Sequence, residues 1–436
     1  MLAGKTAPLP PATRWRVPMI LICLMAFADT FGGLFQEVLP LSLILRSAII
    51  LYLLCHALGR STKCPNVQIL WFAFILFFFT RVLTDYYIIL NHSVVTLEVS
   101  ATLRFLYFPL LFSYLLAQIE NKRLSRVEIR WCLLAYGWLV LLSLLLGQVT
   151  GLGGTIGGRG ADVEAGKGFM IGANEVGLML LLTAPFVGSA ITGWTRNVII
   201  GGIGQLLIYS LAGLHVFTKS SLIASLVAAY SVYRSYMSRG IGTKILLWIA
   251  IFAGMLFTLR FINNNVEIIY DFAEATFFSS LIDGNIFSFL FRGRDNYIGA
   301  IFPPLLNDQY NWLFFLFGAG EFFIREVSIA PLMLEQGQGT TFEMDFFDAF
   351  GAYGLVGCSL YALILGILLK QSGSLRLPRE IAVALFCVAA HSFLAGHVLF
   401  SPQVTTLMVL ILLYFRADNR TMGHGNAPSS AAQPAR

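Results

Sequence analysis

The stretch MDFFDAFGAYGLVGCSLYALILGILL, residues 344–369, decides the fold class of this chain. Its charged residues, Asp345 and Asp348, stand at its beginning, and a long uncharged run follows them. A helix needs about 20 predominantly apolar residues to cross a bilayer, and this stretch is long enough. We therefore predict a membrane-spanning helix with two carboxylates at its N-terminal end.

The rest of the chain has the same character. Of its 436 residues 57% are hydrophobic and 12% are charged, whereas roughly a quarter of the residues in soluble domains are charged. This composition excludes a soluble enzyme and a disordered protein. We predict an all-α polytopic membrane protein with about twelve spans, at 17–36, 38–57, 67–88, 100–119, 131–149, 171–192, 197–214, 216–236, 244–261, 344–369, 380–399 and 402–416.

Basic residues gather at alternate ends of these spans. They are frequent at 122–130 and 370–379, whereas residues 82–103 contain no Lys or Arg. Because basic residues mark the cytoplasmic side of a membrane protein, we predict that both termini are cytoplasmic. The net charge of +6 is then explained by membrane orientation, and no nucleic-acid partner is expected.

The predicted spans divide the chain into five parts. Residues 1–16 form a cytoplasmic tail, 17–262 hold spans one to nine, 263–343 form a large loop, 344–416 hold the last three spans, and 417–436 form a disordered tail. The large loop is too long for a passive connector. We expect short interfacial helices in it that lie over the bundle. A second external segment, 150–170, is rich in glycine.

The large loop contains two arginines in the stretch FRGRDNYIGAI, residues 291–301. Arg292 and Arg294 flank a glycine, so that their guanidinium groups can converge on one anion. Arginine presents a rigid fork that suits phosphate oxygens. We predict a clamp on a phosphate or pyrophosphate, and the alternative is a pair of interfacial arginines that touch lipid headgroups.

Three carboxylates, Glu343, Asp345 and Asp348, stand where the large loop enters the span at 344–369. Charged groups at the mouth of an apolar helix are costly, and one of them can act as a general base near the aqueous interface. A structural alternative stays open. Residues 340–343 match a capping box with Glu343 at the third helical position, and Asp345 in the first turn suits the helix dipole.

Basic residues within the predicted spans are further candidates. Arg46 lies at mid-span, Arg104 near an outer end and Lys219 one turn into its span. His215 lies four residues before Lys219, which predicts that the two share a helix face. These residues predict a cationic cavity that holds a polyanionic head group, with snorkelling to the interface as the alternative. The Cys and His spacing predicts no metal site.

Four segments, taken in order, resemble motifs of the O-antigen ligase and polymerase superfamily. GFMIGANEVGLMLLLTAP (168–185) is similar to its Asn-containing span start, and FTKSS (217–221) to its small-residue and basic motif. FRGRDNYIGAI resembles the arginine motif of its large periplasmic loop. LFGAGEFFI (316–324) followed by FEMDFFDAFGAYGLVG (342–357) resembles its Gly-x-Gly turn and the segment that re-enters the membrane.

The resemblance implies a bundle of the C-type glycosyltransferase kind, which works on undecaprenyl-pyrophosphate-linked glycans at the periplasmic face of the bacterial inner membrane. In that family the loop arginines hold the pyrophosphate, and this role passes to Arg292 and Arg294. Asn174 and Lys219 match positions that line the family's cavity. We add three residues as candidates for substrate binding: Arg46, Arg104 and Asp348.

The chain departs from the ligases at one position. The ligases place a histidine, their proposed base, near the point of re-entry, and here no histidine stands between His215 and His391. Glu343 or Asp345 occupies that region instead. This departure favours the polymerase branch of the superfamily.

We therefore predict a metal-independent glycosyltransferase without a cofactor, which polymerises lipid-linked repeat units into O-antigen, capsular or exopolysaccharide. Arg292, Arg294 and Lys219 would stabilise the leaving pyrophosphate, and Glu343 or Asp345 would be the base. Expected partners are the lipid-linked oligosaccharide, the bilayer, a chain-length regulator and a flippase. The rivals are a ligase acting on lipid A core, a polysaccharide flippase or transporter, and a structural subunit of an export complex. Many transporters contain internal repeats, and this sequence shows none.

Overall fold

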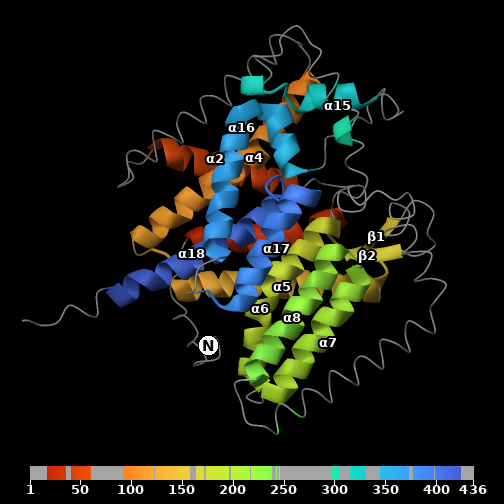
Figure 1. Ribbon diagram of the computed structural model, residues 1–436, viewed down its shortest axis with the longest axis vertical. Coiled ribbons are helices and arrows are strands. Elements are labelled where there is room, and N and C mark those ends of the chain that lie inside the picture. The colour runs from red at the N-terminus through yellow and green to blue at the C-terminus, as the bar shows by residue number, and fades with distance from the viewer. Residues whose placement is uncertain are drawn as a thin grey trace, which may run out of the picture.

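The computed structural model describes residues 17–35, 41–59, 92–121, 123–157, 164–170, 173–195, 198–216, 218–237, 242, 245, 297–299, 301, 303, 315–329, 344–372, 377–396 and 398–423. This part of the chain is mostly helical (Figure 1). Its elements are α1 (Val17–Phe31), η1 (Gly32–Phe35), α2 (Leu41–Gly59), α4 (His92–Glu120), α5 (Arg126–Thr150), β1 (Gly154–Gly157), β2 (Glu164–Gly168), α6 (Ala173–Thr195), α7 (Val198–Val216), α8 (Lys219–Met237), α15 (Glu321–Ile329), α16 (Asp345–Ser372), α17 (Arg379–Ala395) and α18 (Pro402–Gly423).

Several of these helices are suited to a bilayer. Among the described residues, five helices are long and apolar enough to cross a membrane: Val17–Leu34, Leu97–Glu120, Arg126–Thr150, Asn174–Thr195 and Asp345–Lys370. Shorter apolar helices are Ile44–Cys55, Ile200–Val216 and Pro402–Arg416. The helices indicate a membrane-embedded protein, in agreement with the composition. The twelve-span topology stays a prediction, since the spans at 67–88 and 244–261 lie outside the described residues except for residue 245.

Helix α18 lies in the middle of the bundle. It contacts α4, α5 and α6, and its residues 402–414 are buried. A helix that is buried on all sides needs apolar or internally satisfied residues around its whole circumference. Around it, α6, α7 and α8 pack on one another, α1 packs on α5, and α17 connects α16 to α6 and α8.

A small sheet is the one departure from the predicted all-α class among the described residues. In the Gly-rich segment, β1 and β2 pair antiparallel, with Thr155 opposite Gly166 and Gly157 opposite Glu164. The hairpin is fixed to α5, because the Phe169 N–H donates to Ser143 Oγ over 3.0 Å. Gly168 has φ of +62°, and a Cβ there would lie 2.8 Å from the Ser143 carbonyl oxygen. Only glycine suits that position.

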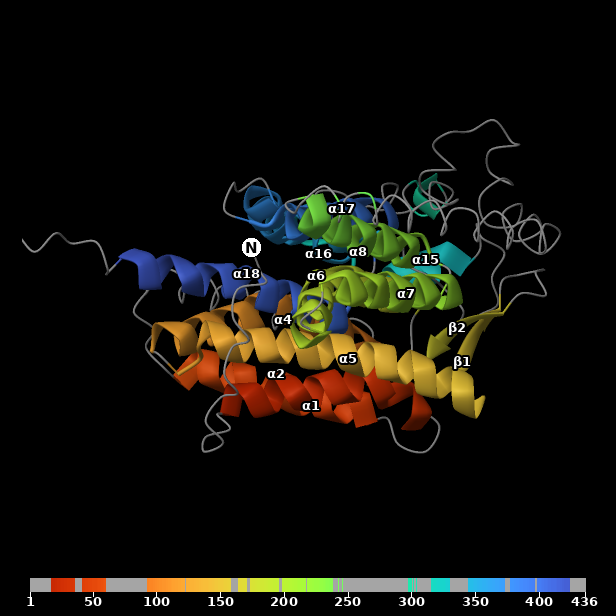
Figure 2. The same ribbon diagram turned by 90° about the horizontal axis from the view of Figure 1, so that it is seen from below.

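The two ends of the bundle differ. Figures 1 and 2 both place the hairpin and α15 toward the same end. At the opposite end Arg126 lies over the Tyr414 ring, 4.4 Å from its centroid, and Arg234 forms a 2.6 Å ion pair with Glu380. These contacts join helix ends that we predict to be cytoplasmic. The side of the membrane that each end faces stays a prediction.

Candidate functional site

Three of the predicted site residues, Arg292, Arg294 and Glu343, lie outside the described residues. The structure places the others on five helices: Arg46 on α2, Arg104 on α4, Asn174 on α6, Lys219 on α8, and Asp345 and Asp348 on α16. Helix α4 begins at His92 rather than at residue 100. Arg104 therefore lies about three turns inside α4, where its Nε donates to the Ser100 carbonyl over 3.3 Å.

The starts of α6 and α8 pack directly on each other. A Cβ at Gly177 of α6 would lie 2.2 Å from Ser220 Oγ and 2.4 Å from Thr218 Oγ1, so the two backbones approach more closely than a side chain allows. This contact joins the segments GANEVG and TKSS, which are far apart in the sequence. It brings Asn174 and Lys219 to neighbouring helix starts.

The small residues of the TKSS segment begin helix α8. The Ser221 N–H donates to Thr218 Oγ1 over 3.2 Å, and the Thr218 N–H donates to Ser221 Oγ over 3.0 Å. Such reciprocal bonds satisfy N–H groups that a helix start leaves without partners. Lys219 is the first residue of α8. A positive charge at a helix N-terminus interacts unfavourably with the helix dipole, which costs about 0.3–1 kcal/mol of stability. A bound anion would offset that cost.

The prediction that His215 and Lys219 share a helix face was wrong. Helix α7 ends at Val216 and α8 begins at Lys219, so the two residues belong to different helices. Thr218 stands just before α8 and caps its start. His215 instead packs against the hairpin, since a Cβ at Gly166 would lie 2.0 Å from its Nε2.

Helix α16 is broken within its membrane-spanning length. Gly354 has φ of +59° and ψ of −149°, which interrupts the hydrogen-bond ladder and frees carbonyl groups before it. The segment before α15 satisfies them: the Ala319 N–H donates to the Gly351 carbonyl over 2.7 Å, and Gly320 N–H to the Ala352 carbonyl over 3.2 Å. A bilayer tolerates irregular backbone only where protein satisfies its polar groups. The Gly-x-Gly segment and the re-entry segment are therefore one structural unit.

Replacing Gly354 by alanine is expected to destabilise this unit. Its backbone conformation costs an L-residue about 1–3 kcal/mol, and a Cβ would lie 2.5 Å from the Leu316 carbonyl carbon. Gly366, on the same helix, has open space around its Cβ position, so Gly366→Ala is the matched control. Thermal unfolding in detergent should show a clear loss of stability for Gly354→Ala and none for Gly366→Ala. Equal melting temperatures would contradict this account of the break.

Asp345 is fully buried at the first turn of α16. Its Oδ2 accepts hydrogen bonds from Ser392 Oγ at 2.7 Å and from the backbone N–H groups of Val398 and Leu399 at 3.0 Å each. Three donors engage this oxygen, and the residue has no exposed surface, so the carboxylate is not open to a substrate. The geometry supports an anchoring role, in which Asp345 fixes the turn between α17 and α18 to the start of α16.

The capping-box prediction concerns residues 340–343, which lie outside the described residues, so it stays a prediction. Among the described residues, Met344 is in a bend and α16 begins at Asp345. Asp345 and Asp348 do stand in the first turn, where negative charge suits the helix dipole. The structure describes a complete capping box elsewhere, at the start of α5, where Ser125 and Glu128 cap each other.

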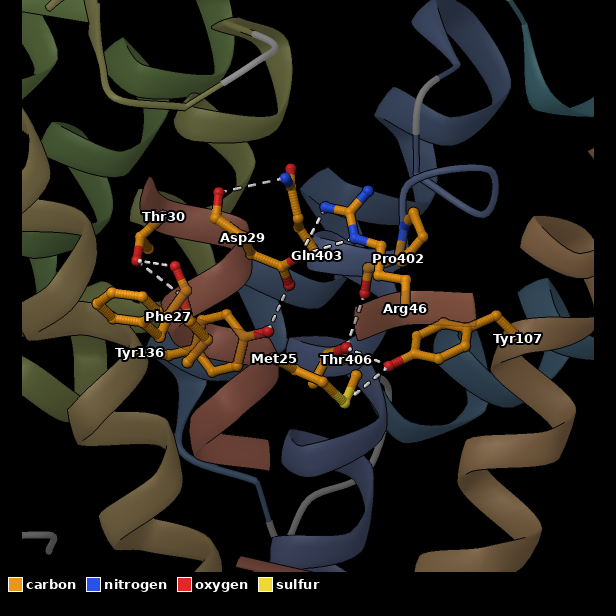
Figure 3. Close-up of polar contacts among 11 residues, drawn as sticks. Met25, Phe27, Asp29, Thr30, Arg46, Tyr107, Tyr136, Pro402, Gln403 and Thr406 are labelled. Atoms are coloured by element: carbon orange, nitrogen blue, oxygen red, sulfur yellow. Dashed lines mark hydrogen bonds and ion pairs between the residues drawn. The ribbon is translucent and has the colours of Figure 1, made fainter. Parts of the chain in front are cut away.

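A buried ion pair joins α1 to α2 (Figure 3). Arg46 Nε and Nη2 both donate to Asp29 Oδ1, at 2.9 and 2.6 Å. The Tyr136 hydroxyl on α5 donates to Asp29 Oδ2 over 2.7 Å. The Asp29 side chain is 1% exposed and the Arg46 side chain 19%. The Asp29 carboxylate thus receives three donors from two helices, while the Arg46 side chain is partly exposed.

Helix α18 completes the polar network around this pair. The Gln403 side-chain amide donates to the Asp29 carbonyl over 3.4 Å, and the Tyr107 hydroxyl lies 3.1 Å from Thr406 Oγ1. Thr405 Oγ1 donates to the Val398 carbonyl over 3.1 Å. The segment 398–406 therefore contacts both acidic residues: its backbone N–H groups donate to the Asp345 carboxylate, and Gln403 donates to the Asp29 backbone carbonyl.

Sequence analysis missed Asp29, Tyr136 and Glu98. Among the acidic residues of the spans only Asp345 and Asp348 were considered, although Asp29 and Arg46 lie within the consecutive predicted spans 17–36 and 38–57. That placement was a detectable signal of an ion pair. Glu98 is buried on α4, and its Oε1 accepts the Phe322 N–H over 2.6 Å. It thereby attaches the start of α15 to the bundle.

Comparison with known proteins adds no assignment to this geometry. No protein-family model matches the chain, and no curated protein matches it.

Proposed function

We propose that this protein is a membrane glycosyltransferase that joins undecaprenyl-pyrophosphate-linked oligosaccharide repeat units into a polysaccharide at the periplasmic face of the inner membrane. One observation supports the proposal above all others. Segments that resemble the O-antigen ligase and polymerase superfamily pair in space: Gly177 with 218–221, and 318–320 with 351–352. Each pair joins segments that are distant in sequence, the first between α6 and α8 and the second between α16 and the segment before α15.

The reaction requires stabilisation of a leaving pyrophosphate. The acceptor hydroxyl oxygen attacks the anomeric carbon of the donor glycan, and the bond from that carbon to the pyrophosphate oxygen breaks. Arg292 and Arg294 bind the negative charge that develops on the leaving group, with Lys219 at the start of α8 as a third cation. We expect inversion at the anomeric carbon from the family resemblance.

The acceptor hydroxyl must lose its proton during this attack. Asp345 is poorly placed to receive it, because its side chain is fully buried and its Oδ2 holds Ser392, Val398 and Leu399. We therefore propose Glu343 as the general base and Asp345 as the residue that holds the re-entry segment in place. The undecaprenyl pyrophosphate leaves with the electron pair of the broken bond, and Glu343 passes its proton to solvent.

The test uses purified protein in detergent with lipid-linked oligosaccharide and no other protein. Separation of the products on a gel should show a ladder spaced by one repeat unit. Unchanged oligosaccharide would contradict the polymerase proposal. Addition of a lipid A core acceptor then separates the rivals, because a ligase would transfer one glycan to it and a transporter would leave it unmodified.

A further inference from the structure

The Arg46 guanidinium uses only one of its two edges within the described part of the chain. A guanidinium group carries five N–H donors in a planar fork. The Nε and Nη2 edge faces Asp29 Oδ1, and Figure 3 shows the outer edge directed away from the carboxylate. The Arg46 side chain is 19% exposed, and among the described residues its hydrogen bonds engage Nε and Nη2 but not Nη1.

The position of Arg46 makes an anionic acceptor the best match. Arg46 is in the second turn of α2, and Asp29 is in the last turn of α1, so the pair lies close to the end of the bundle that holds the hairpin. Near a membrane surface the abundant acceptors are lipid phosphates. A planar fork binds two phosphate oxygens at once, which a point charge cannot do.

We propose that Arg46, positioned by Asp29 and Tyr136, binds the phosphate group of a membrane lipid through its Nη1 and Nη2 edge. The ligand is a lipid-borne phosphate, either the pyrophosphate of the glycan carrier or the headgroup of a glycerophospholipid. Only the choice of the carrier rests on the proposed function. The binding site itself follows from the geometry of the ion pair.

Asp29 and Tyr136 are positioning residues in this site. Both Arg46 donors converge on one Asp29 oxygen, and the Tyr136 hydroxyl holds the other oxygen at 2.7 Å. The carboxylate therefore has a fixed orientation, and so has the plane of the guanidinium. A further hydrogen bond holds the backbone next to Asp29 in place: Ser143 Oγ on α5 donates to the Thr30 carbonyl over 3.0 Å.

The site is connected to the re-entry segment through α18. Gln403 contacts the Asp29 carbonyl, and the backbone five residues earlier donates to Asp345. A phosphate on Arg46 would therefore lie near the same end of α18 as the start of α16. This arrangement would suit a carrier lipid whose pyrophosphate extends toward the loop arginines.

The test measures lipid binding without any glycan substrate. Purified protein in detergent is titrated with phosphatidylglycerol, with undecaprenyl pyrophosphate, and with uncharged diacylglycerol, and the dissociation constants are measured by native mass spectrometry. Loss of Arg46 alone would leave Asp29 buried and charged. The double variant Asp29→Asn/Arg46→Gln removes both charges together and is the variant of choice, with the melting temperature as a check of folding.

The wild-type protein should bind both phosphate lipids more tightly than diacylglycerol. The double variant should bind them at least about 10-fold more weakly, since a hydrogen-bonded charge contributes about 1.5–3 kcal/mol. Arg46→Lys keeps the charge but loses the fork, and should also weaken binding. Tyr136→Phe removes a donor from the buried Asp29 carboxylate, so it should lower the melting temperature. At a temperature at which the variant is still fully folded, it should also weaken phosphate-lipid binding about threefold, which a purely structural role would not produce.

Arg234→Gln is the matched control, because Arg234 also pairs with a buried carboxylate but at the opposite end of the bundle. Its affinity for both phosphate lipids should equal that of the wild type. Equal affinity in the wild type and the double variant would overturn the proposal, and so would wild-type affinity in Arg46→Lys. Tighter binding of undecaprenyl pyrophosphate than of phosphatidylglycerol identifies the carrier as the ligand, and equal binding identifies a headgroup site. Neither outcome depends on polymerase activity.

Discussion

Replacing Arg292 by alanine is expected to lower the rate of polymer formation about 100-fold or more, with expression and folding intact. The leaving pyrophosphate gains negative charge as the glycosidic bond breaks, and a fixed cation stabilises that charge more in the transition state than in the ground state. Removal of a single such donor from an enzyme site lowers the rate about 10²–10³-fold. The measurement is the initial rate of ladder formation with purified lipid-linked oligosaccharide.

A matched control for this variant is available at the start of α17. Arg379 is exposed and lies at the end of the bundle that we predict to be cytoplasmic, so Arg379→Ala should keep the wild-type rate. Arg294→Ala should show a smaller loss than Arg292→Ala, because the family resemblance assigns the pyrophosphate contact first to Arg292. Polymer of normal length at a normal rate from Arg292→Ala would remove the clamp from the mechanism.

The two carboxylates at the re-entry point should separate into one that affects activity and one that affects stability. Glu343→Gln should lower the polymerisation rate about 10²–10⁴-fold with an unchanged melting temperature, as expected for loss of a general base. Asp345→Ala should lower the free energy of unfolding by about 3–5 kcal/mol. It leaves the N–H groups of Val398 and Leu399 buried without their acceptor, each at a cost of about 1–3 kcal/mol.

Rates and unfolding curves measured on the same protein samples test this separation. Glu326→Gln is the control, because Glu326 is exposed on α15 and should change neither quantity. Asp345→Asn tests the assignment further, since the amide oxygen can still accept some of the hydrogen bonds that the carboxylate accepts. Its stability should lie between those of the wild type and Asp345→Ala. A stable but inactive Asp345→Ala protein, together with an active Glu343→Gln protein, would reverse the assignment of the base.

The positions of the described helices could be predicted well from hydropathy alone. Helices α5 and α6 begin and end within a few residues of the predicted spans 131–149 and 171–192, because a bilayer sets the length of an apolar helix. The exact boundaries depended on local hydrogen bonds. Ser125 and Glu128 begin α5 before the apolar run does, and α4 extends to His92, outside its predicted span.

The candidate site was less accessible to sequence reasoning. The capping-box match at residues 340–343 lies outside the described residues and stays a prediction. His215 and Lys219 had helical spacing, but a capped turn separates them. Spacing rules hold within one helix only, and a single sequence does not state where a helix ends when the apolar run continues across the boundary.

By itself, the sequence determined that the protein is helical and suited to a membrane, because burial of apolar length in lipid is a property of composition. The partners of its buried charges were decided by tertiary structure alone. Asp29 pairs with Arg46 and Tyr136, Asp345 binds the α17–α18 turn, and the break at Gly354 is satisfied by residues 319–320. Charges and free backbone groups in an apolar medium must find partners, and only the packing of distant helices determines which partners come within reach.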